Sequence, residues 1–182
     1  GTFMIAAAMT GGDVLVRGAQ QRDQEALLQK MIEAGVTIHP EQDGLRVVGP
    51  ERLLPVDIRT STFPGFPTDM QAQFMAMMAI ADGTSRVSEN VFENRFMHVC
   101  ELQRLGADIS IDGHSAVIHG VKQLLGAPVM ATDLRASACL ILAGLTADNT
   151  TEVSRIYHLD RGYERIEEKL AGLGARIARV PE

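Results

Sequence analysis

The segment FPTDMQAQFMAMMAIADG, residues 66 to 83, sets a pattern that the rest of the chain repeats. It opens with a Thr-Asp pair, continues through almost wholly apolar residues and stops at an Asp-Gly turn. An apolar run of helical length that is bounded in this way predicts a helix buried on every side. A second segment, MATDLRASACLILAGLTAD (residues 130 to 148), has the same form. The fold must therefore hold at least two such helices in its core.

These helices belong to a longer unit that the chain repeats. In each unit an apolar helix leads through a turn to a short strand, then to an amphipathic helix and a further strand. The second unit, AMMAIADGTSRVSENVFENRFMHVCELQRLGADI (residues 76–109), shows this order most clearly. The glycines that end the amphipathic helices, Gly35, Gly106 and Gly174, are 71 and 68 positions apart. A period of this length exceeds the usual solenoid repeat and indicates a few large pseudo-symmetric units.

Short strands are predicted at matching positions of the units. They cover residues 14–16, 36–39, 45–49, 56–60, 85–88, 107–111, 116–120, 128–132, 151–154 and 175–180. The pattern predicts an α/β (α+β) fold of pseudo-threefold βαβαββ repeats, in one domain that spans residues 1–182.

The boundaries of the repeated units do not coincide with the ends of this sequence. The third unit stops at Glu182, where a strand pair should follow, so one strand pair is missing from the set. Counting back 71 residues from Ala72 reaches Gly1, so the first buried helix starts without its cap. We therefore expect the chain to be part of a longer protein.

Composition excludes several classes of function. The formal net charge is -6 and the pI about 5.4, which argues against a nucleic-acid or anionic-membrane surface. Aromatic residues make up 4% of the chain and Trp is absent, so base-stacking platforms are not expected. No apolar run is long enough to cross a bilayer. Cys100 and Cys139 are predicted to be buried free thiols, which fits a reducing compartment such as the cytoplasm.

The two Thr-Asp pairs have two interpretations. Thr68 and Thr132 can be N-caps, with Asp69 and Asp133 in the first helical turn, where the helix dipole favours a carboxylate. Such pairs are common helix starts, so the pattern by itself favours this interpretation. Alternatively, pseudo-symmetry brings both carboxylates to one end of the domain, where they could serve as base and acid.

Three arginines suggest an anion site. Arg95 and Arg161 occupy equivalent positions before the amphipathic helices of the second and third units. Lone arginines are usually solvated or ion-paired on the surface, but Arg135 lies in an apolar helix, where a charge needs a pocket or a partner. Planar guanidinium groups suit phosphate and carboxylate. The five histidines have no partner at zinc-ligand spacing.

Four motifs carry a resemblance to a known family: FPTDMQAQF, ENVFENRFMHVCEL, ATDLRASACLILAG and YHLDRGYERIEEKL. They resemble the UDP-N-acetylglucosamine 1-carboxyvinyltransferases, a branch of the enolpyruvyl transferase family, and the resemblance covers essentially all 182 residues. It implies an enolpyruvyl-transferase-like inside-out α/β barrel domain, in which the chain is the C-terminal portion. The partner domain and an N-terminal strand pair would lie elsewhere in the parent protein. The family's reactive cysteine belongs to that other domain, so Cys100 and Cys139 do not take its role.

The resemblance also implies roles for individual residues. Asp69 would be the base beside the sugar 3-hydroxyl, and Asp133 the second carboxylate, near the reacting enolpyruvyl carbon. Arg161 would hold the carboxylate of phosphoenolpyruvate, and Arg95 and Arg135 would be further arginines of the substrate pocket.

Val91 and Phe92 would contact the nucleotide sugar. The implied reaction transfers an enolpyruvyl group from phosphoenolpyruvate to UDP-N-acetylglucosamine, the first committed step of peptidoglycan synthesis, with no cofactor and no metal. The isolated chain is expected to be inactive without the other domain. It is also expected to self-associate, because a missing strand pair leaves core and sheet edges uncovered. Two alternatives stay open: a sister transferase acting on shikimate 3-phosphate, and a non-catalytic module that binds a nucleotide sugar.

Overall fold

The computed structural model describes residues 1–180. Its α-helices are α1 (Thr2–Met9), α2 (Glu25–Glu33), α3 (Gln71–Met78), α4 (Val99–Arg104), α5 (Leu134–Thr146), α6 (Tyr157–Asp160) and α7 (Ile166–Gly172). Short 3-10 helices are η1 (Gln21–Asp23) and η2 (Thr68–Met70). The strands are β1 (Asp13–Arg17), β2 (Thr37–Glu41), β3 (Gly44–Val48), β4 (Ile58–Arg59), β5 (Thr84–Ser88), β6 (Asp108–Asp112), β7 (Ser115–His119), β8 (Leu124–Leu125), β9 (Pro128–Met130), β10 (Ala147–Asp148) and β11 (Glu152–Ser154).

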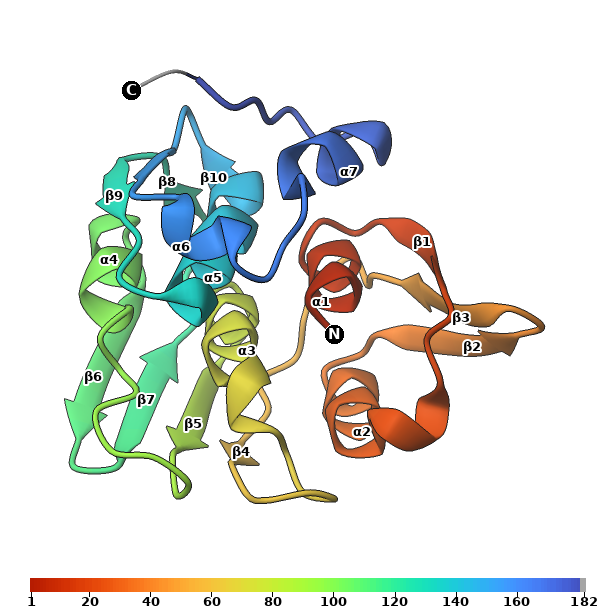
Figure 1. The fold of residues 1–182 in the computed structure, drawn as a ribbon. Coiled ribbons are helices and arrows are strands. Elements are labelled where there is room, and N and C mark those ends of the chain that lie inside the picture. The colour runs from red at the N-terminus through yellow and green to blue at the C-terminus, as the bar shows by residue number, and fades with distance from the viewer. Residues whose placement is uncertain (181–182) are drawn as a thin grey trace.

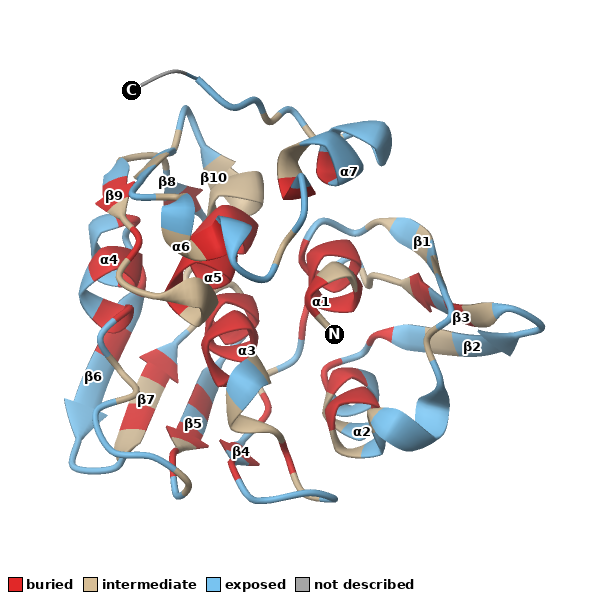
Figure 2. Ribbon diagram, viewed as in Figure 1, coloured by how far each residue is buried: buried red, intermediate tan, exposed pale blue. Residues whose placement is uncertain are grey.

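The three apolar helices α1, α3 and α5 pack against one another at the centre of the molecule (Figure 1). Figure 2 shows that burial is concentrated on them. Every residue of α3 is buried, and in α5 burial is continuous from Ala136 to Ala143. A helix with neighbours on all sides must be apolar all round, so the sequence prediction of buried helices is confirmed.

Sheets and amphipathic helices surround this centre, which gives the helix-inside, sheet-outside arrangement that the resemblance implies (Figure 1). The first unit forms the sheet β1-β3-β2, and the second forms β4-β5-β7-β6, in which only β4 pairs in parallel. The helix α2 covers the first unit and buries Leu27, Leu28 and Met31. The strands predicted for these two units are therefore confirmed.

The third unit departs from the prediction. Its strands form two short parallel pairs, β8 with β10 and β9 with β11. The strand predicted at residues 175–180 is wrong, because those residues form no ladder. In the first two units the equivalent strands, β2 and β6, pair with the antiparallel strand that follows them, and no such strand follows within residues 1–180.

Two glycines show the repeat in three dimensions. Gly49 and Gly120 are 71 positions apart, and each donates its N–H, over 2.8 Å, to a glycine carbonyl in the turn after a buried helix, that of Gly12 or Gly83. A Cβ on Gly49 would lie 2.5 Å from the carbonyl oxygen of Ala7, and one on Gly120 would overlap that of Ala81. Only glycine lets the strand backbone approach the helix end this closely.

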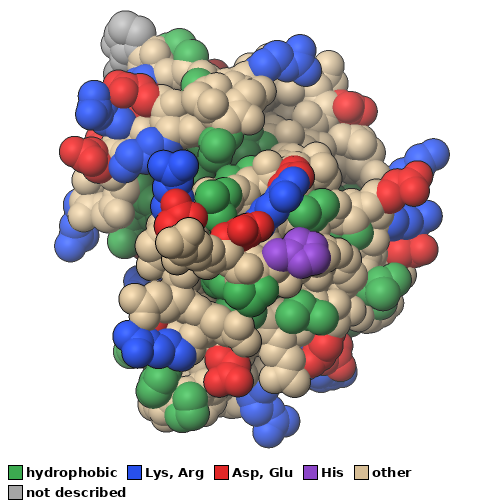
Figure 3. All heavy atoms as spheres, turned by 90° about the vertical axis from the view of Figure 1, so that its right-hand side faces the viewer, with side chains coloured by type: hydrophobic (Ala, Val, Ile, Leu, Met, Phe, Trp, Pro, Cys, Tyr) green, Lys and Arg blue, Asp and Glu red, His purple; other side chains and the backbone are tan. Residues whose placement is uncertain are grey.

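The surface mixes charges of both signs. Figure 3 shows the face of the three-stranded sheet, where acidic and basic side chains alternate instead of gathering by sign. Arg46 Nε donates to Asp13 Oδ1 over 2.7 Å on this sheet, and the arginine keeps the pKa of Asp13 below its ordinary value. Among residues 1–180, no helix has both the length and the apolar content needed to cross a membrane.

Candidate active site

The N-terminal ends of the three buried helices meet at one end of the domain. Gln73 of α3 donates from Nε2 to Oγ1 of Thr2, the first residue of α1, over 3.4 Å. Asp69, just before α3, pairs with Arg135 in the first turn of α5. The helices are therefore parallel, and their dipoles add positive potential at this end, which favours anionic ligands.

Asp133 is the N-cap of α5. Its backbone is extended, and its Oδ1 accepts from the backbone N–H groups of Arg135 (2.7 Å) and Ala136 (3.0 Å). The prediction that Thr132 caps this helix is wrong, since Thr132 lies one residue before the cap position. Its buried Oγ1 has no hydrogen-bond partner among residues 1–180.

Thr68 is not a cap either. No side chain caps η2 or α3, and Thr68 Oγ1 instead donates to Oε2 of Glu89 over 2.9 Å. A buried carboxylate accepts a stronger hydrogen bond than a side-chain hydroxyl would accept from a backbone N–H, which explains the choice. Asp69 does lie in the first turn of η2, as predicted, and it is exposed.

Arg135 joins the two carboxylates. Its Nε donates to Asp69 Oδ1 over 2.7 Å, its Nη2 donates to the same oxygen, and its backbone N–H binds Asp133. The half-buried guanidinium thus has the partner that its apolar surroundings require. Within residues 1–180, no hydrogen bond to Oδ2 of either aspartate is formed, so each carboxylate keeps one oxygen available to a ligand.

Arg161 belongs to a segment that crosses the same helix ends. It follows α6 and is exposed. A Cβ on the next residue, Gly162, would lie 2.9 Å from Cδ2 of Leu134, the first residue of α5. Tyr163 then places its hydroxyl 2.7 Å from Thr2 Oγ1, at the start of α1. These contacts hold the segment of Arg161 against the first residues of α5 and α1.

Val91, Phe92 and Arg95 lie in the loop that follows β5. The backbone N–H groups of Val91 and Phe92 donate to Glu89 Oε1 over 2.9 and 3.1 Å. The Arg95 guanidinium carbon stands 4.2 Å from the centre of the Phe92 ring, which is a cation–π contact. Because Glu89 also binds Thr68, this loop is tied to the turn that carries Asp69. Sequence reasoning missed Glu89, since a single glutamate after a strand gives no signal of burial.

Two titratable groups are buried near Asp133. Burial lowers the pKa of His98 to about 4, against the opposing effect of the Asp133 carboxylate. Burial also raises the pKa of the Cys139 thiol, and the charge of Asp133 adds to this rise. The prediction of a buried free thiol is confirmed for Cys139, but it is wrong for Cys100, which lies on the exposed face of α4. A thiol that stays protonated is a poor nucleophile, so Cys139 has a packing role.

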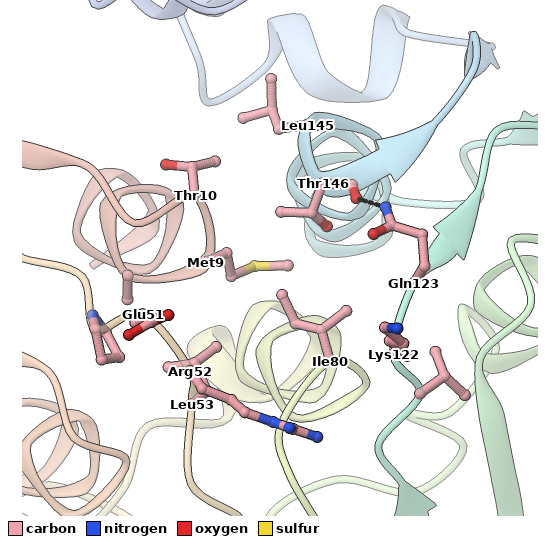
Figure 4. A pocket seen from close by; sticks show the side chains of 13 residues that line it. Met9, Thr10, Glu51, Arg52, Leu53, Ile80, Lys122, Gln123, Leu145 and Thr146 are labelled. Carbon is pink, nitrogen blue, oxygen red and sulfur yellow. Dashed lines mark hydrogen bonds between the residues drawn. The ribbon is translucent and has the colours of Figure 1, made fainter.

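A cavity of about 490 Å³ lies at the opposite end of the helices (Figure 4). Met9, Ile80 and Thr146, at or just beyond the C-terminal ends of α1, α3 and α5, line it together with Arg52 and Lys122. Helix C-termini carry negative potential and disfavour anions, so this cavity is the poorer place for an anionic substrate. In the described residues 1–180, no group of three His, Cys, Asp or Glu side chains could hold a metal ion.

The comparisons with known proteins agree with this architecture. The sequence model of the EPSP synthase family (3-phosphoshikimate 1-carboxyvinyltransferase) matches residues 1–170. The chain belongs to the EPSP synthase family. In structure, this member of the EPSP synthase family is similar to the enolpyruvyl transferase NikO from Streptomyces tendae, with a TM-score of 0.85 and 26% identity, over 97% of this chain and 42% of that one. An EPSP synthase from Acinetobacter baumannii shares the fold, with a TM-score of 0.66 and 20% identity over 90% of this chain and 41% of that one.

Within the EPSP synthase family, curated relatives of one name match at high identity. UDP-N-acetylglucosamine 1-carboxyvinyltransferase of Geotalea uraniireducens (strain Rf4) is 66% identical over 182 residues, which are all of this chain and 44% of the relative. The enzyme of the same name from Geobacter metallireducens (strain ATCC 53774 / DSM 7210 / GS-15) is 64% identical over the same share of each chain. The chain therefore spans less than half the length of these relatives.

Proposed function

We propose that this chain carries part of the active site of a UDP-N-acetylglucosamine 1-carboxyvinyltransferase. The main observation in support is the 66% identity, over all 182 residues, with a relative of that name. The complete enzyme transfers the enolpyruvyl group of phosphoenolpyruvate to the 3-hydroxyl of UDP-N-acetylglucosamine and releases phosphate, as the first committed step of peptidoglycan synthesis. The chain supplies the C-terminal portion, and a partner domain, with an N-terminal strand pair, supplies the rest. The buried free thiol fits a reducing compartment, and we place the reaction in the bacterial cytoplasm.

Asp69 is suited to take the proton of the sugar hydroxyl. Its Oδ1 is held by Arg135, so the carboxylate has a fixed orientation, and its Oδ2 is left for the substrate. A carboxylate held within hydrogen-bond reach of a hydroxyl can act as general base during attack on the central carbon of phosphoenolpyruvate. The exposed position of Asp69 leaves room for the sugar.

Asp133 is suited to exchange a proton at the methylene carbon. That carbon gains a proton as the sugar oxygen bonds to the neighbouring carbon, and loses one again as phosphate leaves. The same carboxyl group can give and take this proton. The hydrogen bonds from the N-terminal end of α5 to Oδ1 keep the group in place while Oδ2 faces the ligand.

The arginines and the helix ends serve the anionic groups. Arg161 is proposed to hold the carboxylate of phosphoenolpyruvate, with Arg135 and Arg95 as further arginines of the pocket. Three parallel helix N-termini add potential of the same sign. Val91 and Phe92 are proposed to contact the nucleotide sugar, and the cation–π contact with Arg95 gives the Phe92 ring a defined position.

Phosphate release tests the proposal. The chain alone should release none from phosphoenolpyruvate and UDP-N-acetylglucosamine. A hybrid enzyme, in which the chain replaces the corresponding 182 residues of the Geotalea uraniireducens relative, should be active. Asp69→Asn in this hybrid should lower kcat by a factor of about 10² or more with folding retained. Full turnover by the chain alone would contradict its dependence on the missing portion, and an inactive but folded hybrid would contradict the function.

One alternative acceptor is shikimate 3-phosphate. The description of the family model favours it, but the identity to solved EPSP synthases is 20%, against 66% to the nucleotide-sugar enzyme. Product analysis with both acceptors separates these functions. A non-catalytic module that binds a nucleotide sugar is the other alternative. In that case Asp69→Asn would change stability and leave the rate of phosphate release unaffected.

A further inference from the structure

Glu89 is a buried carboxylate with no role in the reaction as described above. It directly follows β5, and 2% of its surface is exposed. Its Oε1 accepts hydrogen bonds from Thr60 Oγ1 over 2.8 Å and from the backbone N–H groups of Val91 and Phe92. Its Oε2 accepts from Thr68 Oγ1 over 2.9 Å.

The surroundings of Glu89 are built for a carboxylate. A buried carboxylate is costly unless several donors solvate it, and here four donors from three segments do so. The arrangement extends further, because Thr60 Oγ1 in turn accepts from the backbone N–H of Asn90 over 2.9 Å. Such a network fixes the relative positions of its members, since each lost bond leaves a buried polar group without a partner.

The three segments that Glu89 joins lead to the two sides of the proposed substrate site. Thr68 immediately precedes Asp69, the proposed base. Val91 and Phe92 are the proposed contacts to the nucleotide sugar. Thr60 follows β4 and connects both to the sheet. A change at Glu89 would therefore shift the base and the nucleotide-sugar contacts relative to each other.

We propose that Glu89 is a positioning residue that couples the nucleotide-sugar loop to the general base. The hydrogen bonds to Oε1 fix the position of the loop that receives the nucleotide sugar. The hydrogen bond to Oε2 fixes the position of the turn that orients Asp69 toward the sugar hydroxyl. Glu89 itself touches no reacting atom. The inference rests on the proposed function, because it assigns to these segments the substrate roles given above.

The hydrogen bonds to the two carboxylate oxygens of Glu89 can be tested separately. Thr68→Val keeps the shape of the side chain and removes only the donor to Oε2, so Asp69 loses its alignment while the loop keeps its hydrogen bonds. We expect kcat to fall about tenfold, with the KM for UDP-N-acetylglucosamine changed less than about twofold, because misalignment of a catalytic group acts on the chemical step. Thr68→Ser restores the donor and should restore kcat.

Glu89→Gln disturbs both sides at once. The amide keeps one acceptor oxygen but loses the charge and the second acceptor, so the loop and the turn are both less well held. We expect kcat to fall about tenfold or more and the KM for UDP-N-acetylglucosamine to rise severalfold.

The experiment uses the hybrid enzyme and steady-state kinetics with each substrate varied. Thr84→Val is the matched control, because it removes an exposed hydroxyl that bonds His119 on β7, away from the site. Thermal unfolding is measured for every variant, and Thr68→Val carries the test if Glu89→Gln fails to fold. The inference is overturned if Thr68→Val leaves kcat within twofold, or if Thr68→Ser fails to restore it. An inactive unsubstituted hybrid would instead contradict the proposed function.

Discussion

The cap that Asp133 forms and the chemistry proposed for it involve different carboxylate oxygens. Oδ1 caps α5 by accepting two backbone N–H groups, and Oδ2 forms no hydrogen bond within residues 1–180. The stability of the helix start and the proposed proton exchange therefore depend on different atoms of one side chain, and substitution can separate them.

Asparagine is as good an N-cap as aspartate, whereas alanine is not. Asp133→Asn should change the free energy of unfolding of the chain by less than about 0.5 kcal/mol, and Asp133→Ala should lower it by about 1 kcal/mol. Both should lower kcat of the hybrid by a factor of about 10² or more, because neither can exchange a proton. Urea unfolding and phosphate release measure the two effects. Equal activity of Asp133→Asn and the unsubstituted hybrid would leave Asp133 as a cap alone.

His98 should make stability depend on pH. The pKa of His98 is about 4 in the folded chain, below the ordinary value of 6.5. Between pH 6.5 and pH 4, His98 is therefore protonated in the unfolded chain and neutral in the folded chain. The stability present above pH 6.5 is therefore lost toward pH 4, by up to about 3 kcal/mol.

Urea unfolding at a series of pH values measures this loss. His98→Asn removes the titrating group, so it should flatten the dependence between pH 6.5 and 4 whatever its effect on stability at neutral pH. An unchanged slope in the variant would show that other groups cause the loss.

At this scale the sequence located the important positions but misassigned some of them. The Thr-Asp pairs do mark the helix starts, yet Asp133 rather than Thr132 is the cap, and Thr68 binds Glu89. Cap geometry depends on the backbone angles of one residue, which a pattern of residue types does not specify. Glu89 gave no signal, because its donors come from segments that only folding brings together.

At the level of the helices and strands, one contact recurs in the first and second units with nearly the same geometry. It joins the end of a strand to the end of a buried helix. Gly49 and Gly120 bring a strand backbone against the carbonyl of a buried helix end in the first and second units. The interval of 71 residues predicts that the two glycines occupy equivalent positions. That neither position has space for a Cβ is known only from the packing in the structure.

Gly120→Ala should destabilise the chain by about 2 kcal/mol, because the added Cβ overlaps the backbone oxygen of Ala81, in the turn that follows α3, and the backbone must shift to make room. Gly172→Ala is the matched control. Nothing lies within 4 Å of its added Cβ, and the residue is helical, so this change should stabilise by up to about 1 kcal/mol. Urea unfolding of both variants measures the difference, and equal stabilities would contradict the packing argument.

For the whole molecule, the three units differ in how well their strands are paired. The strand β7 forms five-residue ladders with both β5 and β6, whereas the ladder of β8 and β10 has two residue pairs and that of β9 and β11 has three. In α7 only Ile166 and Leu170 are buried. Few ladder bonds and little buried apolar surface favour local opening.

Hydrogen exchange should reveal this difference. Backbone amides of β10 and β11 should exchange at least about tenfold faster than those of β7, because opening the third unit breaks fewer interactions. Exchange mass spectrometry on the intact chain measures both in one sample, so β7 is the internal reference. Uniform protection across the strands would contradict the expectation.

Self-association of the chain stays a prediction. Large apolar side chains, among them Leu15, Ile111 and Leu173, are exposed. Exposed apolar surface favours association, so sedimentation velocity should show dimers or larger species that increase with protein concentration. A monomer at every concentration would contradict this.

The sequence by itself determined the repeat, the three buried helices and the strands of the first two units, because apolar periodicity and turn residues act locally. It also determined the family, because the motifs are long and specific. Only the tertiary structure decided that Arg135 holds Asp69, that Asp133 caps α5, and that residues 175–180 form no strand. The first and the last depend on which groups meet across distant parts of the chain, and the cap depends on the backbone angles of Asp133. Hydrogen bonds and strand pairing need a partner in space, and residue order does not state where that partner will be.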